Sequence, residues 1–172
     1  MLLGLAFLIF LVLSSFENMI FFNILDVVLQ NQYLAVGMIF VHNVLVVSLI
    51  LLSMTFYVNL VLNFFKKRKY EYVVLEHPRT FAIVFTVMVV FLSILRGSTL
   101  ITGGVNVDAL PLIVLISTPI GVVEGYGIYL TIKKTLAKDM TMKDLVSIYG
   151  IFLVAAMMEV GFINLLRSVS GS

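Results

Sequence analysis

Long apolar runs constrain this chain more than any other feature of its sequence. Four of them stand out, at residues 34–65, 79–101, 111–132 and 145–166. About 20 consecutive apolar residues in a helix span the hydrocarbon core of a bilayer, so each run is long enough to cross it. The runs therefore predict transmembrane helices.

The composition also indicates that lipid surrounds this chain. The chain has 172 residues, of which 62% are apolar and 12% are charged. An average soluble domain is about half apolar and about a quarter charged. A soluble fold of this length could not bury so much apolar surface, because a short chain still exposes much of its surface. We therefore expect the lipid bilayer to be the main partner of this chain.

The first 30 residues predict a further span and an amphipathic helix. Residues 1–15 form a short apolar run. In the segment 16–30 the polar residues Asn23, Asp26 and Gln30 are spaced by 3 and 4, which places them on one helical face. Such a helix lies in the membrane interface. The predicted fold is all-α: a single integral membrane domain, residues 1–172, with a bundle of about five transmembrane helices.

Basic residues predict the orientation of the bundle. The KKRK segment at 66–69 and the lysines in 133–143 flank the two middle spans, and the loop 102–110 has no basic residue. By the positive-inside rule the basic segments are cytoplasmic. The N-terminus is then cytoplasmic and the C-terminus outside. We interpret the basic segments as topological anchors, with a lipid-headgroup site as the alternative, and we expect no nucleic-acid binding.

Several polar residues interrupt the apolar runs. A charged side chain at the bilayer centre costs roughly 2.5–3.5 kcal/mol on insertion scales, so such residues usually mark pairs or pathways. Counting the helical rise from the span ends places His42, Arg96 and Glu159 at similar heights in the outer half, with Glu124 deeper. This predicts an Arg96–Glu159 ion pair that fixes helix register, or else a polar site. Asn43 is expected to bridge helices.

The stretch STPIGVVEGYG at 117–127 surrounds Glu124 with glycine and proline. Pro119 has no N–H and should bend its helix. Gly121 and Gly125 form a G-x-x-x-G pair that lets another helix approach closely. We therefore expect Glu124 to point inward at a tight helix contact, neutral and hydrogen-bonded to a freed carbonyl or to an asparagine.

Catalysis finds little support in the sequence. The chain lacks Cys, HExxH, GxSxG and a glycine-rich phosphate loop. We expect no catalytic residue, no cofactor and no enzymatic activity. His42, Glu124 and Glu159 could bind a divalent cation in principle, but this ligand set does not select a metal. The segment 76–78 (EHP) is interpreted as a helix start, with Pro78 in the first turn.

Three motifs carry a family resemblance. They are HNVLVVSLILL at 42–52, TPIGVVEGYG at 118–127 and AAMMEVGFINLL at 155–166. Together they resemble the stage II sporulation protein M family of five-span integral membrane proteins. The resemblance implies that the family's features fall on Asn43, Pro119, Gly121, Glu124 and Glu159. One departure is Ile120, where the family often has histidine.

The resemblance also implies a membrane component that works with partners. The family's namesake acts with peptidoglycan-degrading proteins, and relatives occur in organisms that do not form spores. Two hypotheses follow for this chain. The first is a non-enzymatic membrane subunit or scaffold that assembles with itself or with other membrane or envelope proteins through the Gly121/Gly125 face. The alternative is a small channel or transporter that uses the intramembrane residues Glu124, Glu159, His42 and Arg96.

Overall fold

The computed structural model describes residues 30–64, 74–102 and 110–170, together with residues 12, 13, 16, 20 and 28. Within these ranges side chains are described for 30–59, 74–91 and 111–164, apart from 112, 113 and 116. The described residues form four long α-helices and no strand: α2 (Gln32–Phe64), α4 (Pro78–Thr102), α5 (Leu110–Ala137) and α6 (Met142–Ser170). These helices cover the four long apolar runs, so the all-helical prediction is confirmed for the described part of the chain. The predicted span 1–15 and interfacial helix 16–30 lie almost wholly outside it.

Two helix starts follow directly from local chemistry. Asn31 precedes α2, and its Oδ1 accepts hydrogen bonds from the backbone N–H groups of Tyr33 at 3.1 Å and Leu34 at 3.3 Å. An asparagine N-cap of this kind satisfies donors that have no partner inside the helix. The helix α4 begins at Pro78, whose missing N–H costs nothing in a first turn. The predicted helix start at 76–78 is therefore confirmed.

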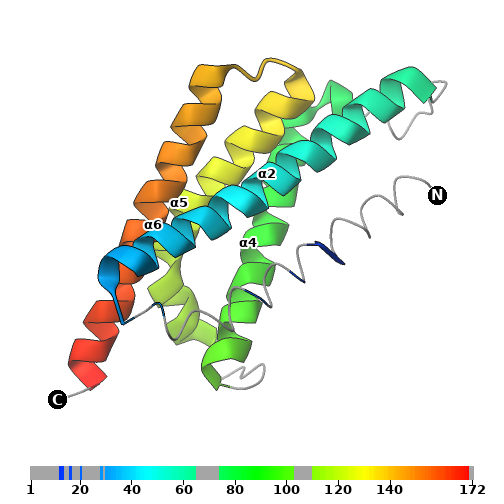
Figure 1. Cartoon of the computed structure of the whole chain (residues 1–172). Coiled ribbons are helices and arrows are strands. Elements are labelled where there is room, and N and C mark those ends of the chain that lie inside the picture. The colour runs from blue at the N-terminus through cyan, green and yellow to red at the C-terminus, as the bar shows by residue number, and fades with distance from the viewer. Residues whose placement is uncertain are drawn as a thin grey trace.

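The four helices form a bundle in which α5 is central and packs against the other three (Figure 1). Successive helices run in opposite directions, and α2 crosses α5 and α6 diagonally (Figure 1). The C-terminal ends of α2 and α5 therefore lie at the same end of the bundle as the N-terminal ends of α4 and α6. We call this the basic end, because it carries Lys133, Lys134, Lys138 and Lys143. The positive-inside prediction requires residues 133–143 to lie on the same side as the end of α2, and the structure has this arrangement.

The interior consists of two apolar clusters. The larger lies among all four helices and the smaller between the start of α2 and the second half of α6. Ala156 of α6 is fully buried in the smaller cluster, and its small side chain allows α2 to approach closely. A second close contact joins α5 to α6, where Gly127 lies against the ring of Phe152. Small residues at the crossings thus set the distances between helix axes.

The outer surface of the bundle is also apolar. All four helices expose large hydrophobic side chains, among them Val41, Leu45, Leu52 and Phe56 of α2, Val84, Val87 and Phe91 of α4, Leu115 and Val122 of α5, and Val146, Val154 and Met157 of α6. Two helical segments, Gln32–Asn59 with 28 residues and Met142–Asn164 with 23, are long and apolar enough to cross a membrane. Within the most apolar 18 residues of each segment, only 17% and 28% of the residues are buried inside the protein. The core helix of a soluble protein, in contrast, is mostly buried.

Candidate functional site

A polar cluster joins three helices in the middle of the bundle. The side-chain amide Nδ2 of Asn43 on α2 donates a hydrogen bond to Oε1 of Glu124 on α5 at 3.3 Å. Glu159 on α6 lies close enough to Glu124 for the two carboxyl groups to interact electrostatically. Asn43 is buried, and both acids are partly buried. Three residues far apart in the sequence thus form one site.

The heights obtained by counting helical rise concern the same residues. That count groups Glu159 with His42 and Arg96, and the structure adds an electrostatic interaction between Glu159 and Glu124. His42 is partly buried on α2 and is not free of partners. Arg96 lies within α4, but its side chain is outside the described part of the chain, so an Arg96–Glu159 pair stays a prediction.

The glycine pair of α5 faces α4 of the same chain. A Cβ added to Gly125 would lie 3.2 Å from a methyl group of Val90 and 3.5 Å from one of Thr86. A Cβ on Gly121 would lie 3.7 Å from Val90. The close helix contact expected at these glycines is therefore formed within the chain. Assembly of copies through the Gly121/Gly125 face does not fit this geometry, because α4 already covers it. Pro119 is exposed, within an uninterrupted α5.

Thr86 introduces an unusual buried group at this contact. Its Oγ1 is buried and has no hydrogen-bond partner among the described residues. The hydroxyls of Thr131 and Thr135 show the ordinary solution, since they donate to the carbonyl oxygens of Gly127 at 2.9 Å and Thr131 at 2.7 Å. An unsatisfied buried hydroxyl costs roughly 1–3 kcal/mol.

A second polar contact ties α2 to α6. The hydroxyl groups of Ser48 and Tyr149 lie 3.2 Å apart, and either can donate. Buried Val47, Ile128 and Phe152 belong to the apolar cluster around this contact. The sequence analysis missed this pair. The signal that could have found it is a serine and a tyrosine within long apolar runs, because such side chains often hydrogen-bond between membrane helices.

The chemistry available to the cluster is limited to protons and simple ions. Two carboxyl groups and one amide can share a proton or accept a small cation, but they supply no nucleophile activated by a base. The described residues contain no group of three or more His, Cys, Asp or Glu side chains able to hold a metal ion. The divalent-cation site considered for His42, Glu124 and Glu159 is therefore not formed.

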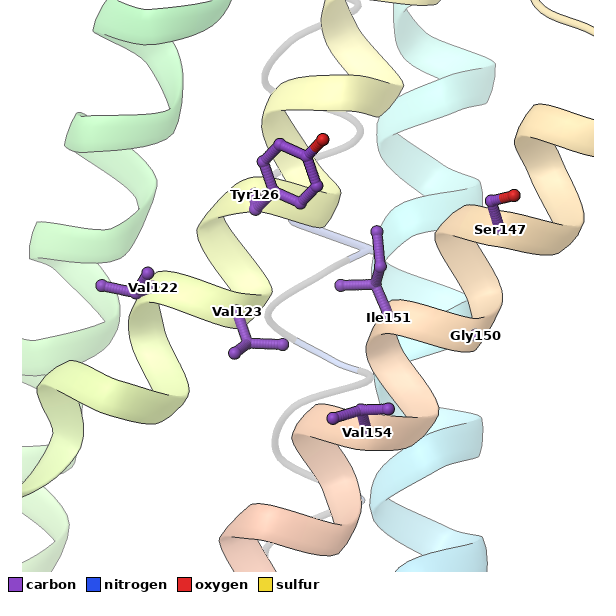
Figure 2. A pocket seen from close by; sticks show the side chains of 7 residues that line it. All are labelled: Val122, Val123, Tyr126, Ser147, Gly150, Ile151 and Val154. Atoms are coloured by element: carbon purple, nitrogen blue, oxygen red, sulfur yellow. The ribbon is translucent and has the colours of Figure 1, made fainter.

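An apolar groove opens between α5 and α6 on the outside of the bundle (Figure 2). Its volume is about 460 Å³, and its lining consists of Val122, Val123, Tyr126, Ser147, Gly150, Ile151 and Val154. No atom lies within 4 Å of the position a Cβ would take on Gly150, so this residue leaves the groove open. Glu124 does not line the groove.

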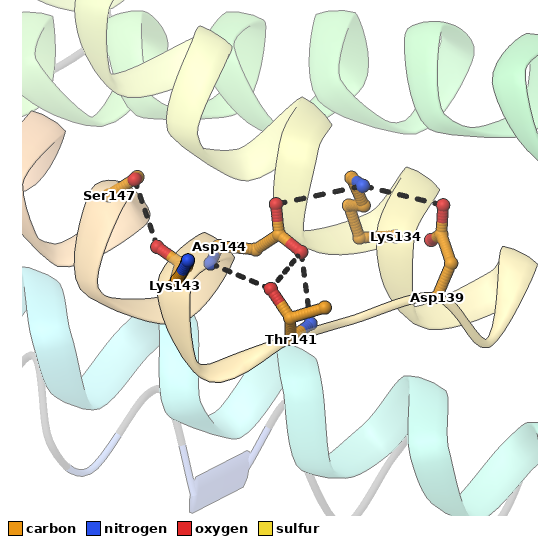
Figure 3. A network of polar contacts seen from close by, with 6 residues as sticks. All are labelled: Lys134, Asp139, Thr141, Lys143, Asp144 and Ser147. Atoms are coloured by element: carbon orange, nitrogen blue, oxygen red, sulfur yellow. Dashed lines mark hydrogen bonds and ion pairs between the residues drawn. The ribbon is translucent and has the colours of Figure 1, made fainter.

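The turn between α5 and α6 closes the basic end with a polar network (Figure 3). Thr141 and Asp144 form a capping box: the Asp144 N–H donates to Thr141 Oγ1 at 3.2 Å, and the Thr141 N–H donates to Asp144 Oδ2 at 2.9 Å. Lys134 lies 3.4 Å from Asp139 and 3.6 Å from Asp144. The hydrogen bond from Lys134 to Asp139 holds the pKa of this lysine above its ordinary value.

Comparison of the chain with protein-family models, with curated proteins and with solved structures found no match.

Proposed function

We propose that this chain is an integral membrane protein with about five transmembrane helices. The observation that carries the proposal is the distribution of polarity. Large apolar side chains are exposed on all four helices, while Asn43 and Glu124 make their hydrogen bond between helices. Exposed apolar side chains are unfavourable in water and favourable in lipid, and polar residues of membrane helices usually point into the bundle and pair with one another. The cytoplasmic placement of the basic end belongs to the same proposal.

Within the membrane we propose a non-enzymatic role, as a subunit or scaffold that assembles with itself or with other membrane or envelope proteins. The described turn between α5 and α6 spans only residues 138–141, which leaves no room there for a catalytic domain. Because α4 covers the Gly121/Gly125 face, assembly would use the outward faces of the bundle. Any catalysis in such an assembly would come from the partners.

The geometry favours a packing role for Glu124. Its carboxyl group accepts a hydrogen bond from a buried amide on another helix, and the groove between α5 and α6 does not reach it.

The resemblance to the stage II sporulation protein M family belongs to this proposal too. It is supported by the hydrogen bond between Asn43 and Glu124 and by the electrostatic interaction of Glu159 with Glu124, because the three residues belong to the three motifs and come from three separate helices.

One observation favours a second candidate, a small channel or transporter. Glu124 and Glu159 come from different helices and are close enough to interact. Two carboxyl groups that interact repel each other when both are ionised, so binding of a proton or a small cation would be favourable there. In this reading His42 and Arg96 would complete the polar route.

The substitution Glu124→Gln separates the two candidates. Glutamine keeps the size and the hydrogen-bond acceptor of Glu124 but can neither ionise nor release a proton. For a scaffold, reconstituted Glu124→Gln protein should keep its oligomeric state, and vesicles should show no proton or cation flux with either form. The control Glu76→Gln removes an exposed carboxyl group near the start of α4. A wild-type flux that disappears in folded Glu124→Gln protein and persists in Glu76→Gln protein would overturn the scaffold proposal.

A further inference from the structure

The walls of the groove between α5 and α6 continue toward the basic end. On α6 the wall residues Ser147, Gly150/Ile151 and Val154 follow each other at helical spacing, and one turn before Ser147 the same stripe reaches Lys143. The two turns are also linked directly, since the Ser147 hydroxyl donates to the Lys143 carbonyl oxygen at 2.9 Å (Figure 3). Lys143 therefore stands at the end of this wall.

The wall on α5 ends in the same way. Val122 and Tyr126 line the groove, and the next positions on this stripe are Tyr129 and Lys133. The rings of Tyr126 and Tyr129 stack, with centroids 6.5 Å apart, and Lys133 Nζ lies 5.7 Å from the centroid of the Tyr129 ring. Because α5 and α6 run in opposite directions, both walls end in a lysine at the basic end.

Within the part of the chain that the structure describes, the acids of the turn leave these two lysines available to an external anion. The two acids of the turn, Asp139 and Asp144, both lie within ion-pair distance of Lys134. Lys143 is exposed and Lys133 is partly exposed. An open apolar groove of about 10 Å, the helical length from Ser147 to Val154, thus leads to two cationic side chains.

We propose that this groove binds one anionic phospholipid, with an acyl chain between α5 and α6 and the phosphate group at Lys133 and Lys143. The occupant is identified by complementarity: the groove offers an apolar wall with one serine, Ser147, and the charges at its end are positive. The two lysines decide between occupants, because a lipid phosphate would pair with them whereas a purely apolar partner helix would not. The proposal rests on the membrane location proposed above.

The test uses full-length protein in detergent and native mass spectrometry with added phosphatidylglycerol, with phosphatidylcholine as the uncharged comparison. The variant Gly150→Leu fills the groove, and Gly161→Leu is its matched control, because a Cβ at either glycine meets no atom within 4 Å. The variants Lys133→Gln and Lys143→Gln remove the proposed phosphate contacts, and Lys138→Gln removes a lysine of the same end outside the two walls. Flotation with vesicles of the same lipids tests membrane insertion separately.

We expect wild-type protein to bind phosphatidylglycerol more tightly than phosphatidylcholine. Gly150→Leu should weaken this binding about tenfold, the equivalent of about two buried methylene groups, and Gly161→Leu should leave it unchanged. Each of Lys133→Gln and Lys143→Gln should weaken it about fivefold, as for one lysine near anionic lipid, and Lys138→Gln should have a smaller effect. Equal binding of the two lipids, or unchanged binding by Gly150→Leu, would overturn the proposal. Failure to float with vesicles would refute the membrane location itself.

Discussion

Gly127→Ala tests the packing of α5 against α6 at its tightest point. A Cβ on Gly127 would lie 2.6 Å from Cε2 and 2.8 Å from Cζ of Phe152, a ring that is 2% exposed. These distances are far inside van der Waals contact, so the buried ring or the helix must shift. Overpacking of this kind costs about 1–3 kcal/mol.

The matched variant Gly150→Ala makes the magnitude measurable. Replacing glycine by alanine inside a helix gains about 0.8–1.0 kcal/mol of helix propensity. Gly150 takes this gain without a clash, because its Cβ position is open. The propensity term cancels between the two variants, so Gly127→Ala should be less stable than Gly150→Ala by about 2 kcal/mol, the middle of the overpacking range.

The assay is unfolding by sodium dodecyl sulfate in bicelles, followed by far-ultraviolet circular dichroism. The substitution Phe152→Leu provides a further check, because a smaller side chain should relieve the clash in Gly127→Ala protein. Coupling between these two positions is then expected in a double-mutant cycle. If Gly127→Ala protein proved as stable as Gly150→Ala protein, the described contact between α5 and α6 would be wrong.

Three other experiments test separate parts of the structure in the same unfolding assay. A double-mutant cycle of Asn43→Ala and Glu124→Leu should give a coupling of about 0.6 kcal/mol, the average for hydrogen bonds between membrane helices, whereas additive losses would place the residues apart. Thr86→Val should stabilise the protein by about 1 kcal/mol, because it removes an unsatisfied buried hydroxyl; a loss would show that Thr86 has a partner. Lys138 has a φ of 59°, so Lys138→Gly should stabilise by about 1 kcal/mol, and a loss would contradict that backbone conformation.

The helices themselves could be predicted from the sequence because long apolar runs have a direct physical meaning. The segment 79–101, for example, appears as α4 from Pro78 to Thr102. The run 111–132 continues to Ala137 in the structure. Its end is set by hydrogen bonds of the last turn, from the Lys138 N–H to Thr135 and from the Asp139 N–H to Lys134, and not by loss of apolar character.

The polar cluster was partly predictable, since Asn43 bridges two helices and Glu124 accepts a hydrogen bond from an asparagine, one of the two partners expected. Asn43, Glu124 and Glu159 stand out because polar residues are costly in apolar runs. Their partners depend on how the helices cross, which the sequence does not state. The sequence also did not determine which helix packs against Gly121 and Gly125, since a stripe of small residues fits a helix of the same chain or of another copy. The capping box at Thr141 and Asp144, in contrast, has a direct sequence signal in the pattern T-x-x-D.

The most direct test of the proposed membrane topology is cysteine accessibility, because the chain contains no native cysteine. Single cysteines placed in 66–72, in 133–143, at Asn106 and at Ser170 would be treated with a membrane-impermeant maleimide in intact cells and in inverted vesicles. The account predicts that 66–72 and 133–143 react only from the cytoplasmic side, and that Asn106 and Ser170 react only from outside. Labelling of 66–72 and 133–143 from opposite sides, or of all positions from both sides, would contradict it.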